Sequence, residues 1–93
     1  MTYELLFHPD ALEEWRGLDN TIQTQFKKKL LERLEIPRVP SAQLRGHRDR
    51  YKIKLRSAGY RLVYEVRESE VVVIVVAVGR RDRNAVYRKA DSR

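Results

Sequence analysis

The sequence predicts an α+β fold: an N-terminal strand, a two-helix hairpin, a three-stranded antiparallel meander and a C-terminal helix. Apolar residues recur at helical spacing between residues 9 and 36, and then alternate with charged residues between residues 50 and 67. An apolar run at residues 71–78 predicts a central strand that is covered on both faces. With 93 residues and no repeat or long linker, residues 1–93 are expected to form one domain.

The first half of the chain predicts a strand at residues 3–7 and then two helices. Pro9 suits the first turn of a helix because its φ angle is fixed. Asp19 or Asn20 offers the N-cap of the second helix, and Gln23 stands where a capping-box partner would. Pro37 ends this helix. The expected buried residues of the pair are Leu12, Trp15, Leu18, Ile22, Phe26, Leu30 and Leu34, with Leu31 widening the stripe.

The second half predicts a hairpin over residues 50–67. A two-residue loop at Ser57 and Ala58 would pair Leu55 with Tyr60 and would keep the apolar faces in register. A short turn at residues 68–70 then leads to the central strand. The last helix is expected to be capped by Asp82 and to run through Val86, Tyr87 and Ala90.

The predicted register sets two cations opposite each other. Lys54 faces Arg61, and Lys52 lies beyond them on the same face of the hairpin. Like charges directly opposite each other destabilise a sheet by roughly 0.2–1 kcal/mol. A bound phosphodiester would relieve this repulsion; the alternative is that the side chains splay into water and Glu65 compensates. Arg81 follows the central strand and can reach the same face.

The excess of positive charge lies in the second half of the chain. Residues 43–93 contain 14 of the 20 Lys/Arg and only 6 of the 13 Asp/Glu, so the whole excess behind the net charge of +7 lies there. This distribution favours a polyanionic partner. The chain has no cysteine, so it has no disulfide and no thiolate metal site. Neither His8 nor His47 shows metal-ligand spacing, and neither is expected to be catalytic.

The N-terminus lacks the features of a signal peptide, and the longest apolar run, residues 71–78, is too short to cross a bilayer as a helix. We therefore expect a soluble cytoplasmic protein without a membrane partner.

Several segments together resemble the RelE family of toxin endonucleases, the toxin half of bacterial type II toxin–antitoxin pairs. They are ALEEW (11–15), KKKL (27–30), LRG (44–46), YKIKLRS (51–57), GYRLVY (59–64), VGRR (78–81) and VY (86–87). The resemblance implies entry into the ribosomal A site and cleavage of the mRNA codon there, which leaves 2′,3′-cyclic phosphate and 5′-hydroxyl ends. It also implies a RelB-like antitoxin as partner, with no metal or cofactor. The residues that match the family's catalytic set are Lys52, Lys54, Arg61, Arg81 and Tyr87.

Chemistry suggests a role for each of these residues. Lys54 would be the general base, with its pKa lowered by the charges of Lys52 and Arg61, which also hold the phosphate. Arg81 would stabilise the leaving oxygen, and Tyr87 would stack on a base, although a helical tyrosine more commonly packs in a core. Nine further cations are expected to contact RNA phosphates: Lys27, Lys28, Lys29, Arg45, Arg48, Arg50, Arg56, Arg80 and Arg83.

Three other functions are compatible with the same composition. A toxin of the same fold could inhibit DNA gyrase without cutting RNA. The basic half would also suit a plain nucleic-acid-binding module or a nuclease that acts without the ribosome. The group of Lys52, Lys54, Arg61, Arg81 and Tyr87 favours ribosome-dependent cleavage over these alternatives.

Overall fold

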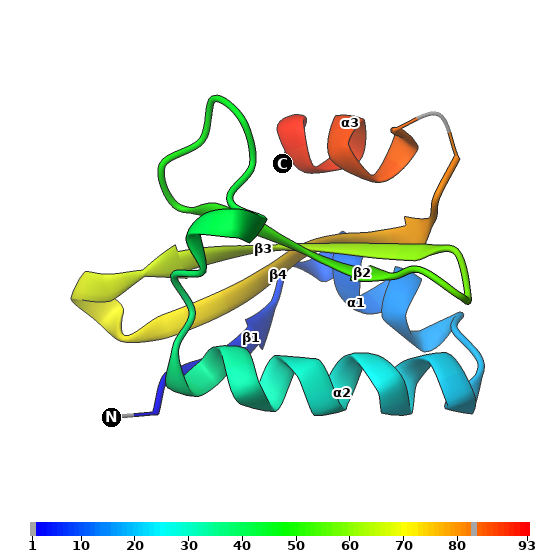
Figure 1. The fold of residues 1–93 in the computed structure, drawn as a ribbon, viewed down its shortest axis with the longest axis horizontal. Helices are drawn as coiled ribbons and strands as arrows, with labels where there is room; N and C mark the ends of the chain where they lie inside the picture. The colour runs from blue at the N-terminus through cyan, green and yellow to red at the C-terminus, as the bar shows by residue number, and fades with distance from the viewer. Residues whose placement is uncertain (1, 83) are drawn as a thin grey trace.

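A computed structural model describes residues 2–82 and 84–93, and it confirms the α+β class. The elements are β1 (Glu4–Phe7), α1 (Pro9–Arg16), α2 (Asn20–Glu35), β2 (Arg50–Leu55), β3 (Tyr60–Arg67), β4 (Val72–Arg80) and α3 (Ala85–Asp91), with 3-10 turns at Pro40–Ala42 (η1) and Glu68–Glu70 (η2). The sheet order is β1-β4-β3-β2; β1 runs parallel to β4, and the other pairs are antiparallel. Helices α1 and α2 lie on one side of the sheet and α3 lies on the other (Figure 1).

Both helices of the N-terminal hairpin begin with a side-chain cap. His8 accepts a hydrogen bond at Nδ1 from the backbone N–H of Asp10 (3.1 Å), which gives this histidine a structural role. Asp19 accepts from the N–H of Ile22 (3.0 Å) and caps α2 as predicted. Gln23 does not complete a capping box. Its amide instead donates to the carbonyl oxygens of Trp15 in α1 and of Leu18 in the connection, and so joins the two helices.

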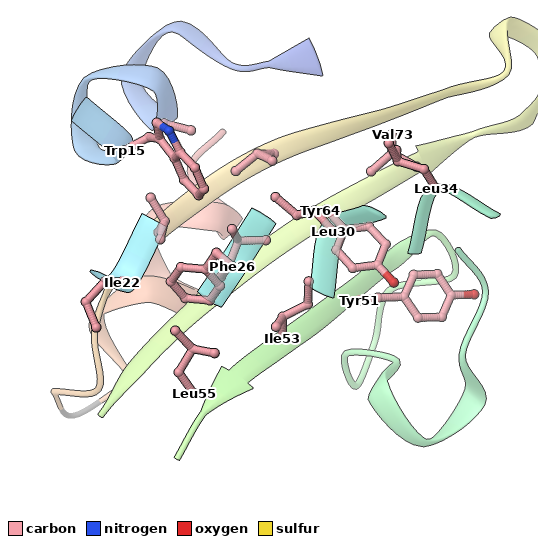
Figure 2. Close-up of a cluster of buried hydrophobic side chains, with 14 of the residues drawn as sticks. Trp15, Ile22, Phe26, Leu30, Leu34, Tyr51, Ile53, Leu55, Tyr64 and Val73 are labelled. Atoms are coloured by element: carbon pink, nitrogen blue, oxygen red, sulfur yellow. The ribbon is translucent and has the colours of Figure 1, made fainter. Parts of the chain in front are cut away.

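The main core lies between the helix hairpin and the sheet (Figure 2). At the α1 side of this core, the ring centroid of Trp15 lies 5.4 Å from that of Phe7 and 6.2 Å from that of Phe26. The predicted stripe of α2 is buried except for Leu31, which is 66% exposed. Leu31 follows Leu30 by about 100° around the helix, so it points away from the sheet, and the prediction that it widens the stripe is wrong.

A smaller core lies under α3 on the opposite face. It contains Val63, Val76, Ala77, Val86 and Ala90. Two consecutive residues of β4, Val76 and Ala77, reach this core because the β3–β4 register shifts between Val63 and Tyr64. Such a bulge adds one residue to a strand and re-aims its neighbours. Because β4 contributes residues to the cores on both sides of the sheet, it is buried on both faces, as predicted.

Two connections differ from the sequence-based predictions. The β2–β3 turn is longer than two residues: it spans residues 56–59, with Gly59 at φ +72° donating its N–H to the carbonyl of Leu55 (2.8 Å). Helix α3 begins at Ala85 after Asn84, which has φ +62°. Asp82 only accepts from the N–H of Ala85 through its backbone oxygen, so the prediction that it caps the helix is wrong.

Helix α3 has only seven residues but is tied down by side chains. Glu14 of α1 pairs with Lys89 (3.0 Å) and with Arg93 (2.8 Å), and Arg93 also donates to the carbonyl of Val76. On the other side, Arg50 donates to the carbonyl of Ala90. These contacts fix the helix against the face of the sheet that carries the predicted catalytic residues.

Candidate active site

The β2–β3 ladder places the predicted cations on one face. Lys54 is paired with Arg61 and Lys52 with Val63, and the register of Leu55 with Tyr60 is the predicted one. Because Val63 packs under α3, the lysines lie on the face of the sheet that α3 partly covers. The like-charge pair expected from the sequence therefore exists in the folded protein.

Arg61 is the most unusual residue of this group because its side chain is buried. It is 7% exposed, and its guanidinium donates to the carbonyl of the preceding Tyr60 (3.1 Å). In the described part of the chain, no carboxylate pairs with it. A largely buried cation without a counter-charge is destabilised, and a bound anion would relieve this cost. Its partner on β4 is Gly79, over which Val86 packs closely: a Cβ at residue 79 would lie 3.4 Å from a methyl carbon of Val86.

Lys54 lies at the electrostatic centre of the site. The charge of Lys52 is the largest cause that lowers the pKa of Lys54, followed by desolvation and then by the charges of Arg61, Arg56 and Arg81. Repulsion among cations disfavours the protonated amine. The structure thus brings Lys52, Lys54, Arg61 and Arg81 together, and it adds Arg56 to the group.

Arg81 is held beside the hairpin by its backbone. Its N–H donates to the carbonyl of Gly59 (2.7 Å), which joins the end of β4 to the β2–β3 turn, while its side chain is exposed. Arg80 lies with its guanidinium carbon 5.8 Å from the centre of the Tyr60 ring. An exposed cation fixed at its main chain is well placed to meet a phosphate.

Tyr87 lines a pocket of about 260 Å³ together with Lys52. The ring is partly buried against the smaller core and partly accessible, so packing and base stacking are compatible. The other lining residues are Leu44, Arg45, His47 and Asp91. The sequence analysis did not place Leu44, His47 or Asp91 at the site. His47 pairs through Nε2 with Asp91 (3.0 Å), which is 44 positions away, and no local sequence pattern signals such a contact.

Comparisons with known proteins agree with this architecture. Residues 5–85 match the model of the ParE toxin of type II toxin–antitoxin systems. The chain is 55% identical to the mRNA interferase toxin RelE of Escherichia coli K12, over 100% of this chain and 98% of that protein. A free-state structure of a double arginine-to-alanine mutant of E. coli RelE superposes with a TM-score of 0.91 at 52% identity, covering 99% of this chain and 97% of that one.

A third match is the intact E. coli RelBE toxin–antitoxin complex, with a TM-score of 0.83 and 56% identity over 87% of this chain and 99% of that one. The chain belongs to the RelE/ParE superfamily of toxins.

The further cations predicted to contact RNA differ in how exposed they are to solvent in this RelE/ParE toxin. Arg45, Arg48, Arg56 and Arg80 are exposed. Arg83 lies outside the described residues. The prediction for Arg50 must be corrected. Its side chain is only 14% exposed, because it pairs with Glu65 (3.1 Å) and donates to α3, so the structure gives it a structural role.

The three lysines of α2 are all exposed, but they cannot serve one surface because successive helical residues are about 100° apart. Lys29 lies beside Lys54 and Arg56, whereas Lys27 borders an apolar hollow formed with Leu5 and the leucines of α2. Among the three, Lys29 is therefore the one next to the candidate site.

The described residues contain no group of three or more His, Asp or Glu side chains arranged to hold a metal ion. None of their helices is both long and apolar enough to span a membrane.

Proposed function

We propose that this toxin is a cytoplasmic, ribosome-dependent endonuclease that cleaves the mRNA codon in the A site. The largely buried Arg61, which is the cross-strand partner of Lys54 and has no carboxylate partner among the described residues, is the observation that carries the proposal. It is the arrangement expected where a phosphodiester supplies the missing negative charge. The name of the E. coli relative, mRNA interferase, supports the same activity at 55% identity.

The chemistry begins with the removal of a proton from the 2′-hydroxyl of the mRNA. Lys54 acts as the base, since its lowered pKa increases the fraction of neutral amine near pH 7. The 2′-oxygen then attacks the adjacent phosphorus while the bond to the 5′-oxygen breaks, giving a 2′,3′-cyclic phosphate and a 5′-hydroxyl. Lys52 and Arg61 hold the phosphate oxygens as negative charge accumulates on them.

Arg81 acts on the leaving group, and Tyr87 acts on a nucleobase of the mRNA. Arg81 stabilises the negative charge on the departing 5′-oxygen. This oxygen takes its proton from solvent water, because an arginine hardly deprotonates. Tyr87 stacks on a nucleobase in its pocket and so orients the 2′-hydroxyl. Positioning of this kind matters because an in-line attack requires the reacting atoms to be aligned.

The test is to map the 5′ ends of an mRNA incubated with toxin, with and without ribosomes. Wild-type toxin should cut only at A-site codons, and Arg81→Ala should reduce the rate by about 10²–10³-fold, as when one transition-state donor is removed. Arg16→Ala removes an exposed arginine from α1 and serves as the matched control. Rapid cleavage of ribosome-free mRNA would contradict the proposal.

A second candidate function is that of a toxin of the same fold that inhibits DNA gyrase without cutting RNA. A fold shared by both kinds of toxin does not decide between them. A supercoiling assay with purified gyrase does. Inhibition of supercoiling with ribosome-bound mRNA left intact would establish this second function in place of the first.

We further propose that a RelB-like antitoxin neutralises this toxin by covering the basic face and displacing α3. The E. coli relative was solved in complex with its antitoxin. A seven-residue helix has little stability of its own, so it depends on the ties to Glu14, His47 and Arg50. Tryptic cleavage within residues 82–93 should change when antitoxin binds; identical protection with and without antitoxin would count against displacement.

A further inference from the structure

A second basic pocket lies on the side of β2 that faces α2 and η1. Its volume is about 220 Å³, and it is lined by Arg33 of α2, Ser41 and Ala42 of η1, the β2 lysines Lys52 and Lys54, and Arg56 of the turn. The two lysines thus border both this pocket and the catalytic face. A polyanion bound at the lysines can therefore continue over the edge strand into the second pocket.

The cations around this pocket differ from the cations that hold the fold together. In residues 2–82 and 84–93, five of the arginines and lysines away from it form ion pairs with carboxylates: Arg38, Arg50, Arg67, Lys89 and Arg93. Within the same residues, no such pair involves Arg33, Lys52, Lys54 or Arg56. Four cations gathered without a carboxylate repel one another, so an anion in the pocket would lower their energy.

Arg33 is held in place before any ligand binds. Its Nη1 donates to the hydroxyl of Tyr64 (2.7 Å) and to the carbonyl of Lys52 (3.4 Å), and its guanidinium carbon lies 5.7 Å from the centre of the Tyr64 ring. Tyr64 in turn donates to the carbonyl of Pro37 (2.7 Å). An arginine fixed in this way loses little rotamer entropy on binding a phosphate.

The same side of α2 continues the basic surface. Lys29 precedes Arg33 by four residues and so lies on the same helix face. It borders a neighbouring hollow together with Gln25, Lys54 and Arg56. The basic surface therefore runs from Tyr87 across the β2 lysines to Arg33 and then along α2.

We propose that Arg33, Ser41 and Arg56 form a second phosphate subsite, which binds an RNA backbone phosphate beyond the one held at Lys52, Lys54 and Arg61. This inference deepens the proposed function and rests on RNA being the ligand. Arg33 supplies a fixed fork of donors, Ser41 a hydroxyl, and Arg56 a mobile charge from the turn. The phosphate belongs either to the mRNA next to the scissile codon or to ribosomal RNA, and the two sources present the same chemistry.

The experiment measures binding, so that it does not depend on cleavage. Labelled toxin is titrated with ribosomes that carry an A-site codon with a 2′-deoxy nucleotide, which cannot form the cyclic phosphate, over a series of salt concentrations. Arg33→Gln should weaken binding roughly tenfold and reduce the slope of log affinity against log salt by about one. Ser41→Asp should do the same by placing a carboxylate in the pocket. Arg16→Gln, which removes an exposed charge on α1, should leave the slope nearly unchanged.

The ribosome state identifies the source of the phosphate. A binding defect that appears only when the ribosome carries mRNA assigns the subsite to the mRNA. A binding defect that is equal on ribosomes without mRNA assigns it to ribosomal RNA. Unchanged slopes for folded Arg33→Gln and Ser41→Asp would overturn the inference, as would a defect confined to antitoxin binding. If Arg33→Gln fails to fold, Ser41→Asp decides, since Ser41 is exposed and makes no part of the Arg33 contacts. Failure of wild-type toxin to cleave, with these binding defects intact, would reject the nuclease activity and leave the subsite standing.

Discussion

The two ends of the β2–β3 hairpin carry cations in the same ladder, but only one end neutralises them. At the first end, Arg50 is the cross-strand partner of Glu65, and their side chains pair at 3.1 Å. At the other end, Lys54 is the partner of Arg61, and the described residues provide no carboxylate for either. One ladder therefore contains an opposite-charge pair and a like-charge pair four residues apart.

This difference separates stability from function within a single hairpin. An opposite-charge pair across a sheet stabilises it by roughly 0.2–1 kcal/mol, and a like-charge pair destabilises it. The Arg50 end also fastens α3 through the carbonyl of Ala90. The Lys54 end gives up this stabilisation and keeps its charges available for a phosphate.

The largest effect is expected when the Lys54 end of the hairpin is given an opposite-charge pair like that of the Arg50 end. Lys54→Glu would pair with Arg61, so the mutant should melt at a higher temperature. It should also lose at least about 10³-fold in cleavage rate, because it removes the base and repels the phosphate. Thermal unfolding and mRNA cleavage on ribosomes measure the two results. Lys54→Gln is the control, since it removes the base without adding a carboxylate and should gain less stability.

A smaller effect concerns the pH dependence of cleavage. The charge of Lys52 is the largest cause of the lowered pKa of Lys54, so Lys52→Gln should let that pKa rise toward its usual value. Since a lysine acts as a base only when neutral, the rising limb of the pH–rate profile should move to higher pH. The rate near pH 7 should fall by about tenfold or more. A lower rate with an unmoved limb would mean that Lys52 only binds phosphate.

At the structural end, Glu65→Gln should reduce stability with little effect on the chemistry. It removes a carboxylate that Arg50 and Arg67 share, at a cost of about 1–2 kcal/mol. Urea unfolding measures the loss, and cleavage at a saturating ribosome concentration provides the control. An unchanged free energy of unfolding would show that the ion pairs of Glu65 do not stabilise the fold.

The same carboxylate gives this loss a pH signature. Burial alone would raise the pKa of Glu65, but hydrogen bonds from Arg67 and Arg50, together with their charges, hold the pKa below its usual value. A depressed folded-state pKa contributes stability above the unfolded-state pKa, and the contribution disappears as pH falls through the folded-state pKa. The difference between wild type and Glu65→Gln should therefore be full at neutral pH and should vanish in acid.

Much of the fold could be predicted because alternation and turn residues fix a register locally. The pairing of Lys54 with Arg61 followed from the apolar residues at 51, 53 and 55 and at 60, 62 and 64, even though the turn proved longer than expected. The parallel pairing of β1 with β4 was not predicted, because it joins segments almost 70 residues apart. The bulge beside Val63 was also missed, since an apolar run on both faces has no period to interrupt.

The site was predictable where its residues lie on strands and less so where loops complete it. Arg50 has the same spacing as Lys52 and Lys54, and only the position of Glu65 and α3 makes it structural. The pocket around Tyr87 depends on His47 and Asp91, which meet only after the loop and α3 are folded. Arg33 did carry a signal, its spacing of four from Lys29, which marks a shared helix face.

The smallest effect is expected at the Arg50 end of the hairpin, where the β3–β4 connection holds Val71 in a strained backbone conformation. Val71 has φ +54° and ψ +49°, a left-handed conformation that costs a β-branched residue about 1–2 kcal/mol. Val71→Gly removes this strain but increases the entropy of the unfolded chain, so a net stabilisation of about 0.5–1 kcal/mol is expected. Val71→Asn should gain somewhat less, and neither should alter cleavage, because residue 71 lies at the opposite end of β4 from Arg81. Destabilisation of both variants in urea would show that the buried part of the valine side chain outweighs the strain at this position.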